Sequence, residues 1–471
     1  MNILIVGNGF DLSHYLPTKY DHFMVAMGAI ENWDIANGEM SFDDLFRSLY
    51  EKEDYFFGYT KAMYKTDEIK ISIEKINELQ KQLKENVWYQ YFSDHVREVK
   101  TWIDFETKIK DALITISHFF DAIENYQKEN NFLNWQFLSA LENKKHDFIL
   151  SQKKIRILEL FNLLEVKYSF YNNSTDVLSE GVSYADNWNS KNSSFPSNLI
   201  KEYKGYNEFL FSEASKNIHN ALKEMKFLFS YYIELISFNS LSLGFLSPFE
   251  NTIDRIYSFN YTSTFQNIYN DASQFYYLHG RVNEVGGINS KIILGISDLE
   301  VDLLKKYDFW GFTKYHQKLL FKTDYQFVDE FKNIKFEIKE KNNLIRDYWM
   351  ARISNGAGSI DHIINETRRN HDENALNLSF LIWGHSLDVS DETYIKDIFS
   401  FNDDFDQGVR VIVYYFNESS NFDLLANLIY ILKKEKVEKW MKNEWLKFEP
   451  NPNIAEINNI QPVELPKIAK A

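Results

Sequence analysis

The chain has 471 residues, a formal net charge of −16 at pH 7, no cysteine and only 17 glycines. This negative charge argues against broad nucleic-acid binding through counterion release. The lack of cysteine excludes disulfides, thiolate nucleophiles and cysteine-ligated zinc. The length favours two or three domains, or one domain with large insertions.

The N-terminal segment lacks the basic and apolar regions of a signal peptide, and no apolar run reaches the about 18 residues needed to cross a bilayer. We therefore expect a cytoplasmic protein with no membrane segment.

Residues 3–6 form the first predicted strand, and Gly7, Asn8 and Gly9 follow it directly. Glycines after a buried strand permit an unusual turn, and a helix that follows would offer free N–H groups to an anion. Thr18 and Asp21 resemble a capping box, so we expect the helix to begin after Pro17. The third glycine of a dinucleotide fingerprint is missing, which leaves a plain tight turn as the alternative.

More than two hundred residues of helical character come next. Within residues 101–123, the apolar side chains recur at steps of three and four, as in an amphipathic helix: Trp102, Phe105, Ile109, Leu113 and Ile116. This pattern predicts a helical insertion over residues 31–250.

Two further predicted strands end in polar residues. Residues 255–259 run into Asn260, and residues 275–278 run into His279. Ligands of open α/β sheets gather at the carboxyl ends of strands, so both side chains are candidates for ligand contact. The alternatives are a helix cap at Asn260 and a structural histidine at position 279. The other ten histidines show no metal-ligand spacing, so we expect no metal.

Residues 292–296 suggest another strand, and residues 301–377 a second helical insertion. The strand predicted at 378–383 leads into Gly384 and Ser386, an arrangement that suits contact with phosphate or ribose. Its alternative is a surface loop capped by Ser390. Residues 409–416 form the last predicted strand, 422–448 a closing helix or two, and the segment from 449 an extended tail.

The motifs, taken in order, resemble the AbiH family of bacteriophage abortive-infection proteins. The resemblance covers most of the chain and is carried by five segments: ILIVGNGFDLSHYLPTKYDHF from residue 3, WIDFE from 102, SFNYT from 258, LHG from 278 and WGHSLDVSD from 383. The same order is similar to a distant sirtuin-like, Rossmann-type α/β fold that binds NAD.

That second resemblance implies roles for individual residues. Asn260 and His279 would surround the nicotinamide ribose as catalytic residues, while the cofactor-binding residues would be Gly7, Asn8, Gly9, Asp11, Gly384 and Ser386. Thr262 stands where sirtuin-like families place an Asp, and the absence of a zinc module puts protein deacylation in doubt. Cleavage of the nicotinamide–ribose bond needs an oriented ribose and a placed water, so Asn260 could hold either and neutral His279 could accept a proton.

We predict an α/β fold with a mostly parallel sheet and large helical insertions. A discontinuous core spans 1–30, 251–300 and 375–420, with helical insertions at 31–250 and 301–374 and a C-terminal helix and tail at 421–471. The predicted protein is an abortive-infection effector that hydrolyses NAD or a related nucleotide, and its insertions sense a phage trigger or self-associate as a homo-oligomer. The alternatives are a non-catalytic sensor of NAD or ADP-ribose and a nuclease, the latter disfavoured by the charge.

Overall fold

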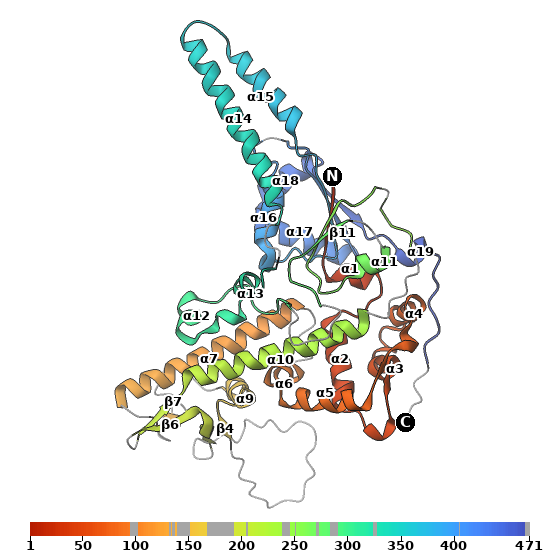
Figure 1. The fold of residues 1–471 in the computed structure, drawn as a ribbon, viewed down its shortest axis with the longest axis vertical. Coiled ribbons are helices and arrows are strands. Elements are labelled where there is room, and N and C mark those ends of the chain that lie inside the picture. Colours follow the sequence, from red (N-terminus) through yellow and green to blue (C-terminus); the bar gives the residue numbers. More distant parts are fainter. Residues whose placement is uncertain are drawn as a thin grey trace, which may run out of the picture.

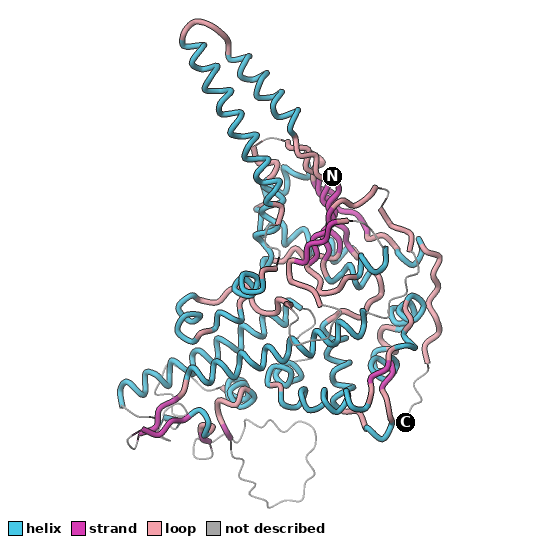
Figure 2. Tube along the Cα trace, in the orientation of Figure 1, coloured by secondary structure: helices cyan, strands magenta, loops and turns pink. Residues whose placement is uncertain are grey.

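The computed structural model describes residues 1–94, 102–130, 133, 137–138, 151–166, 193–203, 206–237, 245–249, 251–269, 273–282, 291–323, 327–404 and 406–466. The fold is mixed α/β. A part that contains a parallel sheet lies above a helical body, and two long helices project from the sheet part (Figure 1). Figure 2 shows the strands of the main sheet gathered in this upper part.

The main sheet has six strands, and every neighbouring pair is parallel. Their spatial order is β12 (Leu446–Pro450), β11 (Arg410–Tyr415), β10 (Ser379–Trp383), β1 (Asn2–Val6), β8 (Arg255–Ser258) and β9 (Gln274–Tyr277). Val6, the last residue of β1, is paired with Trp383 on one side and Ser258 on the other. The carboxyl ends of all the strands therefore lie along one edge.

Each face of the sheet is buried, because successive side chains of a strand point to opposite faces. Ile3 and Ile5 of β1 belong to one apolar core, and Leu4 and Val6 belong to another. The first face is covered by α16 (Glu392–Ser400), α17 (Glu418–Leu432) and α18 (Lys434–Lys442). The second is covered by α1 (Asn8–Ser13), α11 (Thr264–Tyr269) and α19 (Ile454–Ile457).

The strand order reverses between β1 and β10. The helix after β1 packs on one face, whereas the helix after β10 packs on the other. In open α/β sheets this arrangement opens the two loops away from each other and makes the carboxyl edge at that point the usual ligand site.

The helical body surrounds one apolar core. Its helices are α2 (Tyr20–Glu31), α3 (Phe42–Phe46), α4 (Asp54–Met63), α5 (Ile73–Glu85), α6 (Val87–Asp94), α7 (Trp102–Asn130), α9 (Gln152–Leu160), α10 (Phe211–Ser237) and α12 (Val301–Tyr307). Three small antiparallel pairs join them: β2 (Met40–Ser41) with β3 (Lys70–Ile71), β4 (Glu165–Val166) with β5 (Ser193–Ser194), and β6 (Ile200–Tyr203) with β7 (Tyr206–Phe209). The described residues also form short 3-10 helices: η1 (Ile35–Asn37), η2 (Arg47–Leu49), η3 (Thr66–Glu68), η6 (Ser197–Leu199), η7 (Phe309–Phe312) and η8 (Val389–Asp391).

The periodicity predicted for α7 is confirmed, since Phe105, Ile109, Leu113 and Ile116 are fully buried in this core. The helix α13 (Lys314–Phe321) lies between the helical body and the sheet part (Figure 1). It brings the second helical insertion to the edge of the sheet.

Two local predictions were wrong, and a third holds only in part. A helix does begin after Pro17, since α2 starts at Tyr20, but its N-cap is Lys19 and no side chain caps it. The chain before Pro17 also contains α1, which was not predicted and which starts at Asn8 because the turn at Gly7 is short. Residues 292–296 form no strand: they pack into the helical core and make a single bridge, between Ile296 and Thr313. The predicted helical run 422–448 ends at Lys442, and its last residues form β12, where Pro450 closes the edge strand.

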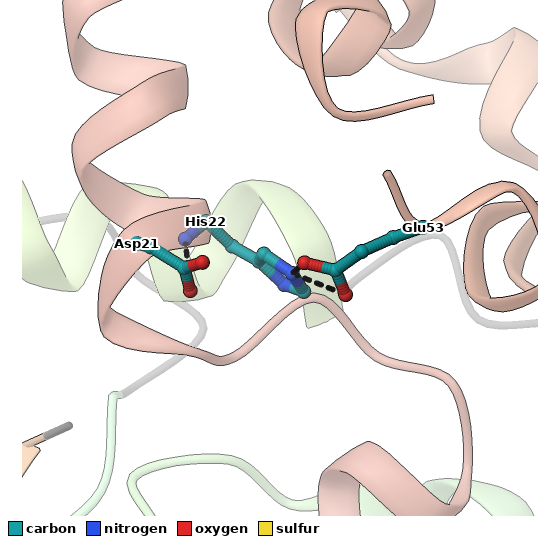
Figure 3. Close-up of side chains that lie close together, drawn as sticks. All are labelled: Asp21, His22 and Glu53. Carbon is teal, nitrogen blue, oxygen red and sulfur yellow. Dashed lines mark hydrogen bonds and ion pairs between the residues drawn. The ribbon is translucent and has the colours of Figure 1, made fainter. Parts of the chain in front are cut away.

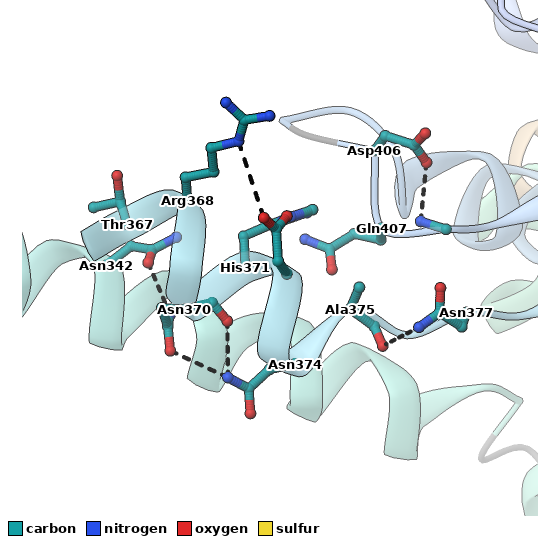
Figure 4. A network of polar contacts seen from close by, with 12 residues as sticks. Asn342, Thr367, Arg368, Asn370, His371, Asn374, Ala375, Asn377, Asp406 and Gln407 are labelled. Atoms are coloured by element: carbon teal, nitrogen blue, oxygen red, sulfur yellow. Dashed lines mark hydrogen bonds and ion pairs between the residues drawn. The ribbon is translucent and has the colours of Figure 1, made fainter. Parts of the chain in front are cut away.

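The projecting hairpin consists of α14 (Asp329–Ser354) and α15 (Ile360–Asn374). The polar residue Asn370 of this hairpin is buried. Its Nδ2 donates to Asn342 Oδ1 at 2.8 Å, and its backbone carbonyl oxygen accepts from Asn374 Nδ2 at 2.8 Å (Figure 4). The first of these hydrogen bonds joins α15 to α14, and the second lies within α15.

Among the described helices, none is both long enough and apolar enough to cross a membrane.

Candidate functional site

Glycine backbones make the first contact at the carboxyl edge. The Gly9 N–H donates to Gly384 O at 2.8 Å. A Cβ on Gly9 would lie 2.7 Å from Gly384 Cα, and Gly384 itself has φ +72. The glycines are therefore required for the approach of two backbones, and the Gly9 N–H is already used inside the protein.

A polar pocket opens beside this contact, on the face covered by α1. The fully buried Asp11 of α1 accepts a hydrogen bond from Thr262 Oγ1 at 2.7 Å, and Asn260 Nδ2 donates to Gly7 O at 2.9 Å. The pocket lining combines polar groups with aromatic rings: Val6, Phe10, Asp11, Ile256, Ser258, Asn260, Thr262, Ser263, Thr264, Phe265, Phe275 and Tyr277. Asp11 Oδ1 has no hydrogen-bond partner.

Burial raises the pKa of Asp11 to about 6, although hydrogen bonds from Thr264, Thr262 and Asn260 oppose the shift. With this pKa the carboxyl group is mostly ionised at pH 7 and keeps a protonated fraction of about one tenth, so it chiefly accepts hydrogen bonds and can take up a proton just below neutral pH.

A second polar group lies around His279. Its imidazole packs against the rings of Phe259 and Tyr261, with centroids 5.2 and 6.4 Å away. His279 Nε2 lies 3.7 Å from Asp391 Oδ1, which is too long for a hydrogen bond, and neither atom has another partner. Burial lowers the pKa of His279 to about 3, so the ring is neutral and the contact is not an ion pair.

His385 joins the two polar groups. Its backbone abuts Gly7, while its Nε2 lies 3.4 Å from Asp391 Oδ2. Because its Nδ1 accepts from the Leu387 N–H at 3.0 Å, Nε2 carries a proton that faces the carboxylate.

The helical insertions add a buried ion pair to this second group. Lys314 Nζ of α13 lies 2.5 Å from Glu106 Oε1 of α7. Burial raises the pKa of Glu106 to about 7 in spite of Lys314. Burial would also raise the pKa of Asp391, but the Lys314 ammonium outweighs it and holds that pKa well below its usual range.

Lys318, one turn after Lys314 on α13, donates to Tyr394 OH at 2.5 Å and lies over its ring. Burial lowers the pKa of Lys318 to about 8. The edge thus holds a neutral imidazole, an ionised Asp391 and two groups, Glu106 and Lys318, that can exchange protons near neutral pH.

The structure does not bring all the predicted site residues to one place. Gly7, Gly9 and Gly384 meet through their backbones, with half-buried Asn8 between the first two, and Asp11 and Asn260 line the pocket beside them. His279 belongs to the second group instead. Ser386 is exposed, and its carbonyl oxygen accepts from Asn427 Nδ2 at 3.0 Å.

Sequence reasoning assigned no role to Glu106, Lys314, Lys318 or Asp391. For Glu106 a signal exists, because it stands four residues after Trp102 and next to Phe105, on the apolar side of α7. Lys314 and Lys318 carry no such signal, since lysine is common on helices.

In the described part of the chain, one group of side chains has the closeness of metal ligands. Asp21, His22 and Glu53 bring ligand atoms within 4.8 Å of one another. Figure 3 shows the Glu53 carboxylate against the His22 ring, whose Nε2 lies 3.3 Å from each Glu53 oxygen. The Lys19 ammonium also bonds Glu53, so a cation already balances this carboxylate.

These features define an α/β protein that carries a buried polar site at the carboxyl edge of a parallel sheet. The family model described as bacteriophage abortive infection AbiH matches residues 3–415, so the chain belongs to this family. No curated protein and no solved structure matches it. The predicted family is confirmed, whereas the sirtuin-like core stays a prediction.

The glycine contact yields a stability prediction. Gly384→Ala should lower the free energy of unfolding by at least about 2 kcal/mol, because the new Cβ would lie 1.9 Å from Phe10 N and the residue keeps a positive φ. Gly28→Ala on α2 is the matched control, because its Cβ meets only Tyr89 OH at 4.0 Å. Urea unfolding measures both, and equal stabilities would contradict the described packing.

The pKa of Asp11 yields a pH prediction. Between pH 4 and 6 the unfolded state ionises first, so Asp11 makes folding less favourable as pH rises. The free energy of unfolding of the wild type relative to Asp11→Asn should fall by about 2–3 kcal/mol from pH 4 to 7. Asp361→Asn on α15 controls for the loss of one carboxylate, and a pH-independent or rising difference for Asp11→Asn would refute the shift.

Proposed function

We propose that this AbiH protein binds NAD or a related nucleotide at the carboxyl edge of its sheet and hydrolyses the N-glycosidic bond after infection. The observation that carries the proposal is the presence of three buried atoms without hydrogen-bond partners at this one edge: Asp11 Oδ1, Asp391 Oδ1 and His279 Nε2. Native proteins keep few such atoms, since each costs free energy until a ligand or water satisfies it.

The composition of the Asp11 pocket supports a nucleoside ligand. Phe10, Phe265 and Phe275 offer aromatic surface, while Asp11 and the hydroxyl of Ser263 offer hydrogen bonds. The chemistry of this lining suits a planar base and a ribose diol, and the enclosed space, which is about that of one water molecule, has to widen to admit them. The carbonyl oxygen of Asn260 can accept from a ribose hydroxyl while its Nδ2 stays bound to Gly7 O.

The position of the pocket gives independent support. It adjoins the point where the strand order reverses between β1 and β10, which is where doubly wound sheets bind nucleotides. The proposed relation to sirtuin-like folds rests on the same order of motifs along the chain.

A second candidate function is a non-catalytic nucleotide sensor. The observation that favours it is the lowered pKa of His279, about 3, which makes this residue a weak proton acceptor. A site that binds the nucleotide without a base would signal through the helical insertions.

The two candidates differ in the fate of cellular NAD. Asn260→Ala and His279→Ala should each leave a folded protein that no longer protects cells against phage, with nicotinamide release lowered by about 10²–10⁴-fold. The wild type should release little nicotinamide before infection, because an always-active NADase would kill its host. The readouts are phage protection, NAD content after infection and thermal melting of each variant.

Asn37→Ala and His118→Ala are the matched controls, since both side chains are exposed and far in sequence from the carboxyl ends of β8 and β9. If infected cells keep their NAD while Asn260→Ala and His279→Ala still abolish protection, the protein is a non-catalytic nucleotide sensor. If both variants protect normally, the site assignment is wrong.

A further inference from the structure

Two insertion helices supply charged side chains to the carboxyl edge. Glu106 comes from α7 and Lys314 from α13, whereas His279 follows β9 and Asp391 ends η8. The insertions therefore contribute to the site as well as to the helical body.

We infer that Glu106 is the general base that activates the attacking water, with Lys314 holding its carboxylate and His279 acting as a positioning residue. This inference rests on the proposed N-glycosidic hydrolysis and names the residue that takes the proton.

Exposure separates Glu106 from its neighbours. Its side chain is 21% exposed, against 8% for His279, 9% for Asp391 and 8% for Lys314. Lys314 binds Glu106 Oε1, and the carboxylate has a second oxygen with acceptor capacity. Glu106 is thus the carboxylate of this group that a water or substrate can reach from solvent.

The pKa of Glu106 also differs from those of His279 and Asp391. A general base works best when its pKa lies near the working pH. The pKa of Glu106 is about 7, whereas that of His279 is about 3 and that of Asp391 lies well below its usual range. The charged and titratable groups around Glu106 are Lys314 and Lys318 on α13, Asp388 and Asp391 after β10, and Tyr261 after β8.

Water gives a proton to the Glu106 carboxylate, and its oxygen forms a bond to the anomeric carbon of the ribose. The N-glycosidic bond breaks, and its electron pair goes to the pyridinium nitrogen, which leaves as neutral nicotinamide. The products are ADP-ribose and nicotinamide, and the proton on Glu106 then passes to solvent.

The test is a pH profile of nicotinamide release from NAD, measured on protein purified from infected cells. In the wild type, kcat should rise through about pH 7 as Glu106 ionises. Glu106→Gln should lower kcat by about 10²–10⁴-fold and remove this rise while NAD binding, measured by calorimetry, changes little. Lys314→Met should move the rise to higher pH, because Lys314 lowers the pKa of Glu106.

Glu129→Gln on the exposed surface of α7 and Lys305→Met on α12 are the controls, and they should keep the wild-type profile. A Glu106→Gln profile that retains the rise would overturn the inference and leave the proposed hydrolysis standing. Wild-type protein that binds NAD but releases no nicotinamide at any pH would overturn the hydrolysis, and the inference with it.

Discussion

The contact between the turn at Gly7–Gly9 and the backbone of Gly384 holds the two halves of the sheet together at their carboxyl edge. The Gly7 N–H donates to Trp383 O at 3.1 Å, and the Gly9 N–H donates to Gly384 O at 2.8 Å. Without side chains at these positions, α1 can begin immediately after β1 and lie directly on the loop after β10. This closeness places Asp11 beside Thr262 and His385 beside Gly7, so both polar groups depend on it.

Several ionisable groups lie at this edge, and burial and neighbouring charges shift their pKa values in opposite directions. Burial raises the pKa of Asp11 and Glu106, and Asp391 and Asp388 raise that of Glu106 further, while Lys314 keeps Asp391 ionised. Burying ionisable groups destabilises the folded protein. Such buried groups therefore occur mainly where they perform chemistry or bind a ligand. The two polar groups lie on either side of the segment that extends β8, with Asn260 facing the Asp11 pocket and Phe259 and Tyr261 facing His279.

Much of the fold follows from local sequence. Five of the six strands are runs of β-branched and aromatic residues, and Asn260, His279 and Gly384 come where such runs end. β12 was missed because its residues continue a helical pattern, and the positive φ of Glu444 marks the break between α18 and β12. Lys314 could not be assigned to the site, because its partner Glu106 is more than two hundred residues away and no local pattern reports a tertiary ion pair. Likewise, the lowered pKa of His279 depends on burial by segments that are distant in sequence.

The proposed function requires that a nucleotide binds at the carboxyl edge of the sheet. A structure determined with ADP-ribose bound would show this, since this product retains the ribose that the site should hold. We expect the ligand to lie beside β1, β8 and β10, with its terminal ribose within hydrogen-bond distance of Asp11 or Asn260 and its anomeric carbon facing Glu106. ADP-ribose bound elsewhere on the chain, or no bound ADP-ribose at millimolar concentration, would contradict it.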